Sequence, residues 1–257
     1  MINLLWLNIS MQNIFKRHEK KYIITREQCA FLQERLARHM VIDRGREYSV
    51  RNLYYDTENW DIIRESMENP LYKEKLRLRF YDHFNCESQG FFELKKKFDG
   101  IVYKRRIAFS LNKIKNLRIR EILSKADSQI SREIGFFLNN REVIEKIFIA
   151  YKRTAYNGLQ DKTLRVSFDK DIFFRLIPSG DFCQNLITEY YGSEEGCRIL
   201  NKNCLIMEIK TSGAIPLWLT SALSENKIFP VSFSKYGTCY AKYVFNIQNP
   251  MEAVNAA

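Results

Sequence analysis

The sequence lacks the short motifs that mark the common nucleotide-binding and zinc-binding folds. Its 10 glycines form neither a GxxxxGK-Ser/Thr loop nor a GxGxxG turn, which excludes a P-loop and a dinucleotide-binding fold as readings of this chain. Its 6 cysteines include no CxxC pair, and none of its 3 histidines stands at zinc-finger spacing. This cysteine usage favours free thiols in a reducing compartment.

Long apolar runs are also absent. No stretch approaches the roughly 20 consecutive apolar residues that cross a bilayer, so we expect no membrane span. Residues 1–9 are apolar but short and lack a basic region, which argues against a signal peptide. Because there is no repeat or linker either, we expect one cytoplasmic domain at 15–246, an N-terminal extension at 1–14 and a frayed C-terminal tail at 247–257.

Acidic residues are in short supply relative to basic ones. The 257 residues include 41 Lys plus Arg against 30 Asp plus Glu, a formal charge of +11. A hydrophobic content of 46% is that of a globular protein. The charge favours a nucleic acid, an anionic membrane or a phosphate-rich ligand as partner, without choosing among them.

Local patterns predict an α+β fold in which strands dominate. Thr25 has the character of a helix N-cap, with Gln28 completing a capping box, and Asp99-Gly100 is a hairpin signal. Strands are predicted at 15–24, 48–56, 73–85, 91–98, 101–110, 143–157, 164–169, 172–177 and 204–211. Helices are predicted at 26–39, 59–66, 111–140, 216–226 and 234–246, and residues 181–203 are ambiguous.

Several of these strands gather charge on one face. In the strand from residue 73, alternation places Lys73, Lys75, Arg77 and Arg79 together, opposite Leu76, Leu78 and Phe80. The charged faces of the later strands carry Glu93, Lys95 and Lys97; Lys104 and Arg106; Tyr151 and Arg153; Arg165, Ser167 and Asp169; and Glu208 and Lys210.

One strand of this kind is ordinary, because antiparallel sheets commonly have a solvated polar face. Repetition favours another arrangement, in which helices cover the apolar faces and the strands close into an antiparallel barrel around the charged faces. The cations that line such a lumen repel one another when it is empty, and Glu19, Glu93 and Glu208 offset only part of their charge. A bound polyphosphate would offset the rest.

The motifs in their order resemble one family. They are Phe15 to Tyr22, Asn52-Leu53-Tyr54-Tyr55-Asp56-Thr57, Lys75-Leu76-Arg77-Leu78-Arg79, Glu93-Leu94-Lys95, Tyr103-Lys104-Arg105-Arg106, Tyr151-Lys152-Arg153, Leu164-Arg165-Val166-Ser167-Phe168-Asp169, Met207-Glu208-Ile209-Lys210 and Phe233-Ser234-Lys235-Tyr236. Over residues 15–245 the chain is similar to the catalytic domain of the vacuolar transporter chaperone (VTC) family. That domain is a polyphosphate polymerase of the triphosphate tunnel metalloenzymes.

The resemblance implies an eight-stranded closed antiparallel tunnel, with helices packed outside, that takes Mn²⁺ or Mg²⁺. Glu208 would hold the metal, with Glu19 as a second candidate. Catalysis would rest on Glu208 and on the cations Arg77, Arg79, Lys95, Arg153 and Arg165. Substrate phosphates would contact Lys21, Lys75, Lys104, Arg106, Tyr151, Lys210, Ser234 and Lys235. Lys104 is chosen over Arg105 because alternation places Arg105 with the apolar set.

The chain departs from the family pattern at two places. Ser232 stands where we expect a lysine, and Glu19-Lys20-Lys21 carries one acidic residue where wider tunnel enzymes often have ExExK, which argues against a second metal. The eukaryotic relatives add phosphate-sensing and transmembrane domains that this sequence does not contain, so a role in vacuolar import is not implied.

The expected activity is transfer of the terminal phosphoryl group of ATP to a growing polyphosphate chain. Three alternatives stay open: a tunnel hydrolase that cleaves triphosphate or tripolyphosphate, a non-catalytic polyphosphate-binding module, and an RNA-binding protein. The aromatic residues do not alternate with the basic ones as base-stacking platforms would, which argues against a specific nucleic-acid partner. The sequence gives no indication of the oligomeric state.

Overall fold

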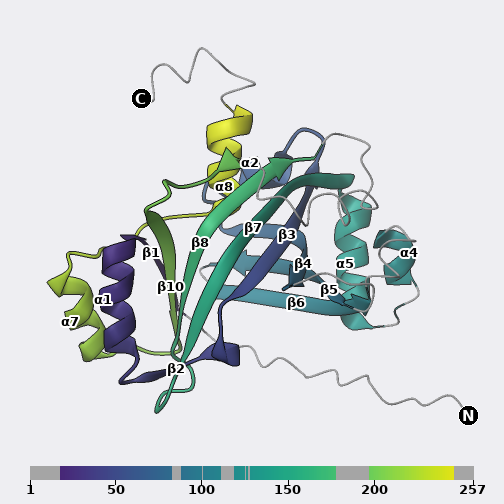
Figure 1. Cartoon of the computed structure of the whole chain (residues 1–257). Coiled ribbons are helices and arrows are strands. Elements are labelled where there is room, and N and C mark those ends of the chain that lie inside the picture. The colour runs from purple at the N-terminus through teal and green to yellow at the C-terminus, as the bar shows by residue number, and fades with distance from the viewer. Residues whose placement is uncertain are drawn as a thin grey trace, which may run out of the picture.

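One antiparallel sheet of ten strands forms the body of the protein in this computed structural model (Figure 1). The structure describes residues 18–82, 88–99, 101–110, 119–124, 126, 128–177 and 197–245. The strands are β1 (His18–Thr25), β2 (Met40–Ile42), β3 (Tyr48–Thr57), β4 (Tyr72–Tyr81), β5 (Gln89–Phe98), β6 (Ile101–Ser110), β7 (Val143–Gly158), β8 (Arg165–Leu176), β9 (Cys197–Arg198) and β10 (Cys204–Thr211).

The hydrogen-bonded path through the sheet runs β1-β10-β8-β7-β3-β4-β5-β6, with β2 beside β7 and β9 beside β8. No pairing joins β1 to β6 within the residues that the structure describes, so the predicted closure by hydrogen bonds is not confirmed. Side chains nevertheless reach across the open side: Lys95 Nζ on β5 lies 3.9 Å from Glu19 Oε2 on β1. The sheet is therefore strongly rolled, with its two ends facing one another.

The segment before the C-terminal helices lies along this open side. The backbone N–H of Val231 donates to the carbonyl of Lys21 on β1 at 2.7 Å, and Ser234 Oγ lies 3.4 Å from Lys75 Nζ on β4. Residues 231–234 thus contact both β1 and β4. A crossing segment, rather than a strand ladder, therefore links β1 to β4 on this side.

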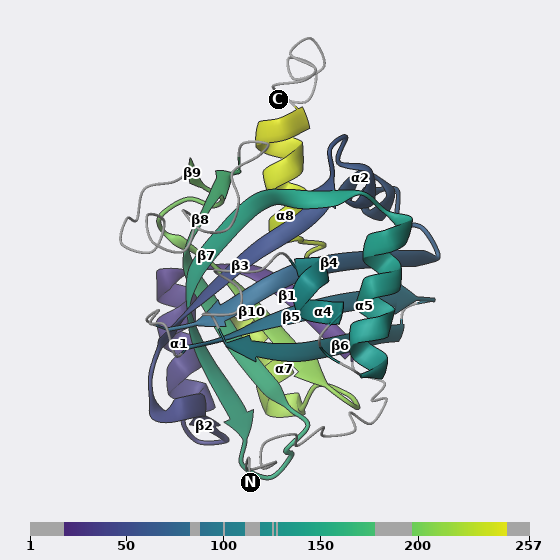
Figure 2. The same ribbon diagram turned by 90° about the vertical axis from the view of Figure 1, so that its right-hand side faces the viewer.

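Helices cover the outer faces of the rolled sheet on two opposite sides (Figures 1 and 2). The helices of the described residues are α1 (Arg26–Leu36), η1 (Asp43–Gly45), α2 (Asp61–Met67), α4 (Ile119–Ser124), α5 (Gln129–Asn140), α7 (Leu217–Glu225), α8 (Lys235–Cys239) and η2 (Tyr240–Phe245). The α1–α7 pair lies beside β1 and β10, and α4–α5 lies over β4 to β6. Of the helices described, none is long and apolar enough to cross a membrane.

The apolar faces pack as alternation predicts. Leu76, Leu78 and Leu94 are fully buried in one cluster with Phe137 and Leu138 of α5. A second cluster joins the apolar faces of β1, β8 and β10 to α1 and α7. The charged faces of the same strands consequently point to the other side, into the rolled sheet.

Several local predictions are confirmed, and others need correction. Thr25 caps α1 with Gln28 completing the capping box. The two strands expected at 164–169 and 172–177 form one continuous β8, because a register shift opposite Ala150 and Lys152 accommodates Asp171 at φ 50°. The helix expected over 111–140 is described as α4 and α5, with Ser128 capping α5. Short β2 and η1 were not predicted.

The remaining predictions fall partly on residues outside the described ranges. These include the start of the first strand, residues 83–85 and 111–118, most of the ambiguous stretch at 181–203, the extension at 1–14 and the tail at 247–257.

A stability measurement tests the packing beneath α5. We expect Leu76→Ala to lower the free energy of unfolding by about 2–5 kcal/mol, because it leaves a cavity in a fully buried layer. Leu71→Ala, at a side chain that is 65% exposed, should change it by less than about 0.5 kcal/mol. Urea denaturation followed by circular dichroism measures both, and equal values for the two variants would contradict this packing.

Candidate functional site

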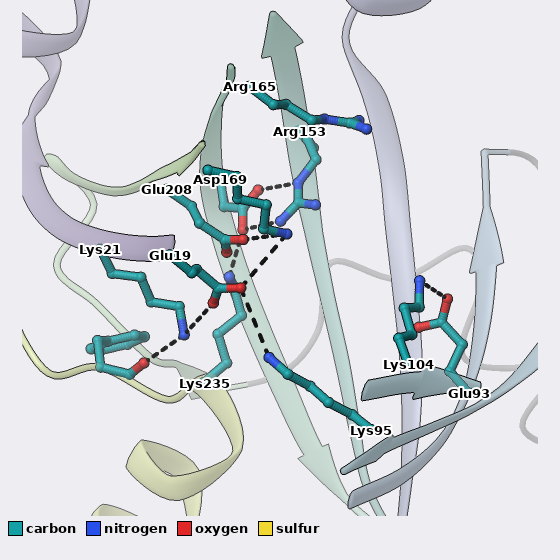
Figure 3. A network of polar contacts seen from close by, with 12 residues as sticks. Glu19, Lys21, Glu93, Lys95, Lys104, Arg153, Arg165, Asp169, Glu208 and Lys235 are labelled. Carbon is teal, nitrogen blue, oxygen red and sulfur yellow. Dashed lines mark hydrogen bonds and ion pairs between the residues drawn. The ribbon is translucent and has the colours of Figure 1, made fainter. Parts of the chain in front are cut away.

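The inner face of the rolled sheet carries three groups of opposite charges, part of which Figure 3 shows. The cations come from nearly every strand of the main path, because alternation directs every second side chain inward. The carboxylates are fewer. Each group is built around Glu93, around Glu19 with Glu208, or around Asp169.

The first group, the Glu93 cluster, lies on β4, β5 and β6. Glu93 is 1% exposed, with Oε2 2.8 Å from Arg77 Nη2 and Oε1 2.7 Å from Lys104 Nζ. Arg79 and Arg106 approach the same carboxylate at 3.6 and 3.7 Å. Four cations therefore share one buried carboxylate.

Two residues of β3 hold the arginines of this cluster, and sequence reasoning did not assign them to the site. Arg79 Nε donates to Asn52 Oδ1 at 2.8 Å, and Arg77 Nη1 lies 3.1 Å from the Tyr54 hydroxyl. Asn52 and Tyr54 are both buried. Their alternation within the Asn52 to Thr57 motif was the available signal, but it did not reveal which strand would lie beside β4.

The second group, the Glu19–Glu208 cluster, lies on β1 and β10. Glu19 pairs in register with Lys210, and Lys21 pairs with Glu208, so all four side chains share the inner face. Lys210 Nζ lies 2.5 Å from Glu208 and 3.8 Å from Glu19, and Lys21 lies 3.3 Å from Glu19. Lys95 approaches from β5. One ammonium thus bridges the two carboxylates that were predicted to hold metal.

The third group surrounds Asp169 on β8, which is 1% exposed. Arg153 contacts it with two hydrogen bonds of 2.6 and 2.7 Å, and Lys235 Nζ lies 2.5 Å away. The Tyr151 ring lies beneath both cations, 4.5 Å from Lys235 Nζ and 5.2 Å from the Arg153 guanidinium carbon. Arg153, Lys235 and Tyr151, each a predicted site residue, therefore lie together, and Asp169 was not foreseen as their counter-ion.

Lys235 is placed by a short helix that a buried carboxylate anchors. Asp56 is fully buried and accepts hydrogen bonds from the N–H groups of Ile62 and Ile63 at the start of α2. It also accepts one of 2.7 Å from the Tyr236 hydroxyl on α8. The Tyr236 ring stacks on Tyr54 with centroids 4.7 Å apart. This anchoring fixes α8 at the inner face.

Two predicted site residues lie at the margin of these groups. Arg165 is half-exposed and contacts Asp43 of η1 at 2.8 Å, so its charge is directed away from Glu208 (Figure 3). Lys75 contacts only the Ser234 hydroxyl, at 3.4 Å, among the contacts of the described residues. Arg105 lies on the outer face and pairs with Glu133 of α5 at 3.1 Å, which leaves Lys104 as the inward residue of that pair.

The surrounding cations hold the interior carboxylates ionised. Burial by itself would raise the pKa of Glu208, but Lys210 and Arg153 lower it well below its usual range. In the same way Arg77 and Arg79 overcome the burial of Glu93 and lower its pKa strongly. Arg153 and Lys235 do so for Asp169. These carboxylates are therefore weak bases.

The pKa values of two interior lysines are also lowered, which for a lysine favours the neutral form. Burial, with Lys95 and Lys21 nearby, lowers the pKa of Lys75 to about 7. Burial lowers the pKa of Lys104 to about 8 even though Glu93 opposes the shift. The interior thus has more lysines and arginines than its few carboxylates can keep in the charged form. This surplus of basic groups favours binding of an anion.

Whether a divalent metal fits depends on Glu19 and Glu208. Among the described residues, no group of three or more His, Cys, Asp or Glu side chains could hold a metal ion by itself. Mg²⁺ is commonly bound by one or two carboxylates together with substrate phosphate oxygens, and Mn²⁺ prefers similar ligands. The carboxylate pair therefore fits an ion that arrives with phosphate, in the position now bridged by Lys210.

Fold and site together define an α+β protein whose rolled antiparallel sheet presents a cationic inner face suited to a polyanion. The family model for the VTC domain matches residues 16–244. The chain belongs to the VTC domain family.

Comparison with curated proteins gave no match. Among solved structures, the chain is similar to the PH1819 protein of Pyrococcus horikoshii OT3, with 14% identity, a TM-score of 0.45 and coverage of 90% of this chain and 99% of that one. It is also similar to a putative adenylate cyclase of Vibrio parahaemolyticus, with 9% identity, a TM-score of 0.44 and coverage of 88% and 98%.

The lowered pKa of Lys75 makes anion binding depend on pH. Above about pH 7 this lysine is largely neutral in the free protein, and a bound anion raises its pKa, so binding takes up a proton. We expect affinity for tripolyphosphate to fall as pH rises from about 7 to about 9, by up to tenfold per unit from this group.

Isothermal titration calorimetry across this range measures the effect. Lys75→Met should flatten the pH dependence, and whatever slope remains belongs to the ligand and to other groups. Identical pH profiles for the variant and the wild type would contradict the assignment of Lys75.

Proposed function

We propose that the protein is a metal-dependent phosphotransferase that passes the terminal phosphoryl group of ATP to the end of an inorganic polyphosphate chain. The observation that carries this proposal is the convergence of Arg77, Arg153 and Lys235, from three separate elements, on one inner face where cations outnumber carboxylates. Membership of the VTC domain family supports polyphosphate as the class of ligand.

Phosphoryl transfer requires positioning and charge neutralisation more than covalent chemistry from the protein. A terminal oxygen of the chain forms a bond to the γ-phosphorus, the bond from that phosphorus to the bridging oxygen breaks, and ADP leaves with that oxygen. Arg77 and Arg153 would hold phosphate oxygens through charge-assisted hydrogen bonds. Mn²⁺ or Mg²⁺, bound by Glu208 and Glu19, would neutralise charge on the transferred group.

A phosphate acceptor needs less assistance from the side chains of the inner face than a water molecule does. Attack by water requires a group that accepts its proton, and the interior carboxylates Glu93, Asp169 and Glu208 have lowered pKa values. A terminal phosphate oxygen is already anionic near neutral pH and needs no such base. The polymerase reaction therefore needs no general base, whereas the tunnel hydrolase, which uses the same cationic cage, would need one such as Lys75, whose pKa is lowered to about 7.

Incubation of the purified protein with ATP and Mn²⁺, followed by sizing of products on a gel, tests the activity. We expect polyphosphate to form, and Arg77→Ala to lower its rate on the order of a hundredfold, because Arg77 is one of the main anion donors. Arg105→Ala is a matched control, since Arg105 lies on the outer face of β6, two strands from Arg77 in the same sheet. Glu208→Gln should also lower the rate.

The other candidate functions appear as distinct outcomes. Release of single phosphates from ATP or tripolyphosphate without polymer would identify a hydrolase. Binding of polyphosphate without turnover would identify a non-catalytic module. Undiminished synthesis by folded Arg77→Ala protein would defeat the assignment of the inner face as the active site.

A further inference from the structure

Glu93 occupies the edge of Arg77 that is best suited to phosphate. Arg77 Nε and Nη2 both contact Glu93 Oε2, at 2.9 and 2.8 Å, and Nη1 contacts the Tyr54 hydroxyl. The paired N–H groups along one edge of a guanidinium bind a carboxylate or a phosphate oxygen in the same way. A phosphate can therefore bind to this edge of Arg77 only when Glu93 no longer contacts it.

The same competition extends to Lys104, whose ammonium contacts the other oxygen of Glu93 at 2.7 Å. The Glu93 cluster lies apart from the carboxylates of β1, β8 and β10 (Figure 3), and no other described carboxylate forms an ion pair with Arg77, Arg79, Lys104 or Arg106. Arg106 Nε is buried without a hydrogen-bond partner. The cluster thus has unused donor capacity, and one carboxylate controls access to it.

We propose that Glu93 competes with phosphate for the donors of Arg77 and Lys104. By binding these two side chains it weakens their hydrogen bonds to bound polyphosphate and permits the chain to be released. This proposal rests on the proposed function, in that it concerns the same inner face and the same class of ligand. Glu93 acts on the bound ligand through the cations around it. It lowers the affinity for polyphosphate and so speeds the release on which turnover depends.

The opposite role would be purely structural, with Glu93 assembling four cations that repel one another without it. The two roles predict opposite signs for Glu93→Gln. Competition predicts tighter binding of tripolyphosphate, on the order of tenfold or more, because phosphate no longer displaces a charge-assisted hydrogen bond. A structural role predicts weaker binding, because the donors disperse.

Isothermal titration calorimetry with tripolyphosphate, without ATP or metal, measures this sign. Steady-state polymer synthesis should fall in Glu93→Gln while the rate of a single turnover is kept, because release becomes slow. Glu74→Gln is the matched control: Glu74 lies on the outer face of β4 beside Lys96, at 3.7 Å, and its loss changes the net charge equally. We expect its affinity to stay within about twofold of the wild type.

Glu93→Gln leaves four cations without a carboxylate, so a charge-balanced pair guards against loss of folding. Glu93→Gln combined with Lys104→Met keeps the net charge of the cluster and should bind tripolyphosphate on the order of tenfold more tightly than Lys104→Met alone. Affinity equal to or weaker than that of Lys104→Met overturns the proposal. A wild type that binds tripolyphosphate but makes no polymer overturns the proposed function instead, and leaves this comparison intact.

Discussion

Like charges cannot share a buried surface without counter-charge, and the interior of this protein is arranged around that constraint. The carboxylates Glu93, Asp169 and Glu208 each lie among several cations, and each is kept ionised although burial opposes it. These carboxylates are too few to balance the positive charge of all the interior lysines and arginines. Lys75, which has a hydroxyl in place of a carboxylate beside it, responds with a lowered pKa. The free protein therefore holds stored electrostatic repulsion that a polyanion relieves.

The segment at the open side of the sheet also helps to place the charged residues of the interior. Within the described residues no ladder joins β1 to β6, and residues 231–234 contact Lys21 on β1 and Lys75 on β4. The same segment leads into α8, where Tyr236 is anchored on Asp56 directly after Lys235. Packing of this short helix thus fixes both the end of the segment at residues 231–234 and a cation of the site.

A polymer that moves along a charged surface needs contacts that exchange readily. Arginine and lysine donors held by wall carboxylates can pass between those carboxylates and phosphate, so the cost of releasing one anion is partly offset by binding the other. Glu93 and Asp169, each 1% exposed, are buried among such donors. The lumen is better described as a surface of paired charges than as a ring of free cations, which is how the strand pattern alone presents it.

The sequence by itself determined what depends on local periodicity. It placed Lys104 inward and Arg105 outward, directed Leu76 and Leu78 toward helices, and located the Thr25 cap, because each follows from alternation or from residues three positions apart. Only the tertiary structure decided that β1 and β6 do not pair within the described residues, that β8 continues through Asp171, that Arg165 pairs with Asp43, and that Asn52, Tyr54 and Asp169 support the cations. Those outcomes depend on how far the sheet rolls and where long side chains end, and such contacts join residues distant in the chain, as Glu19 and Lys95 do.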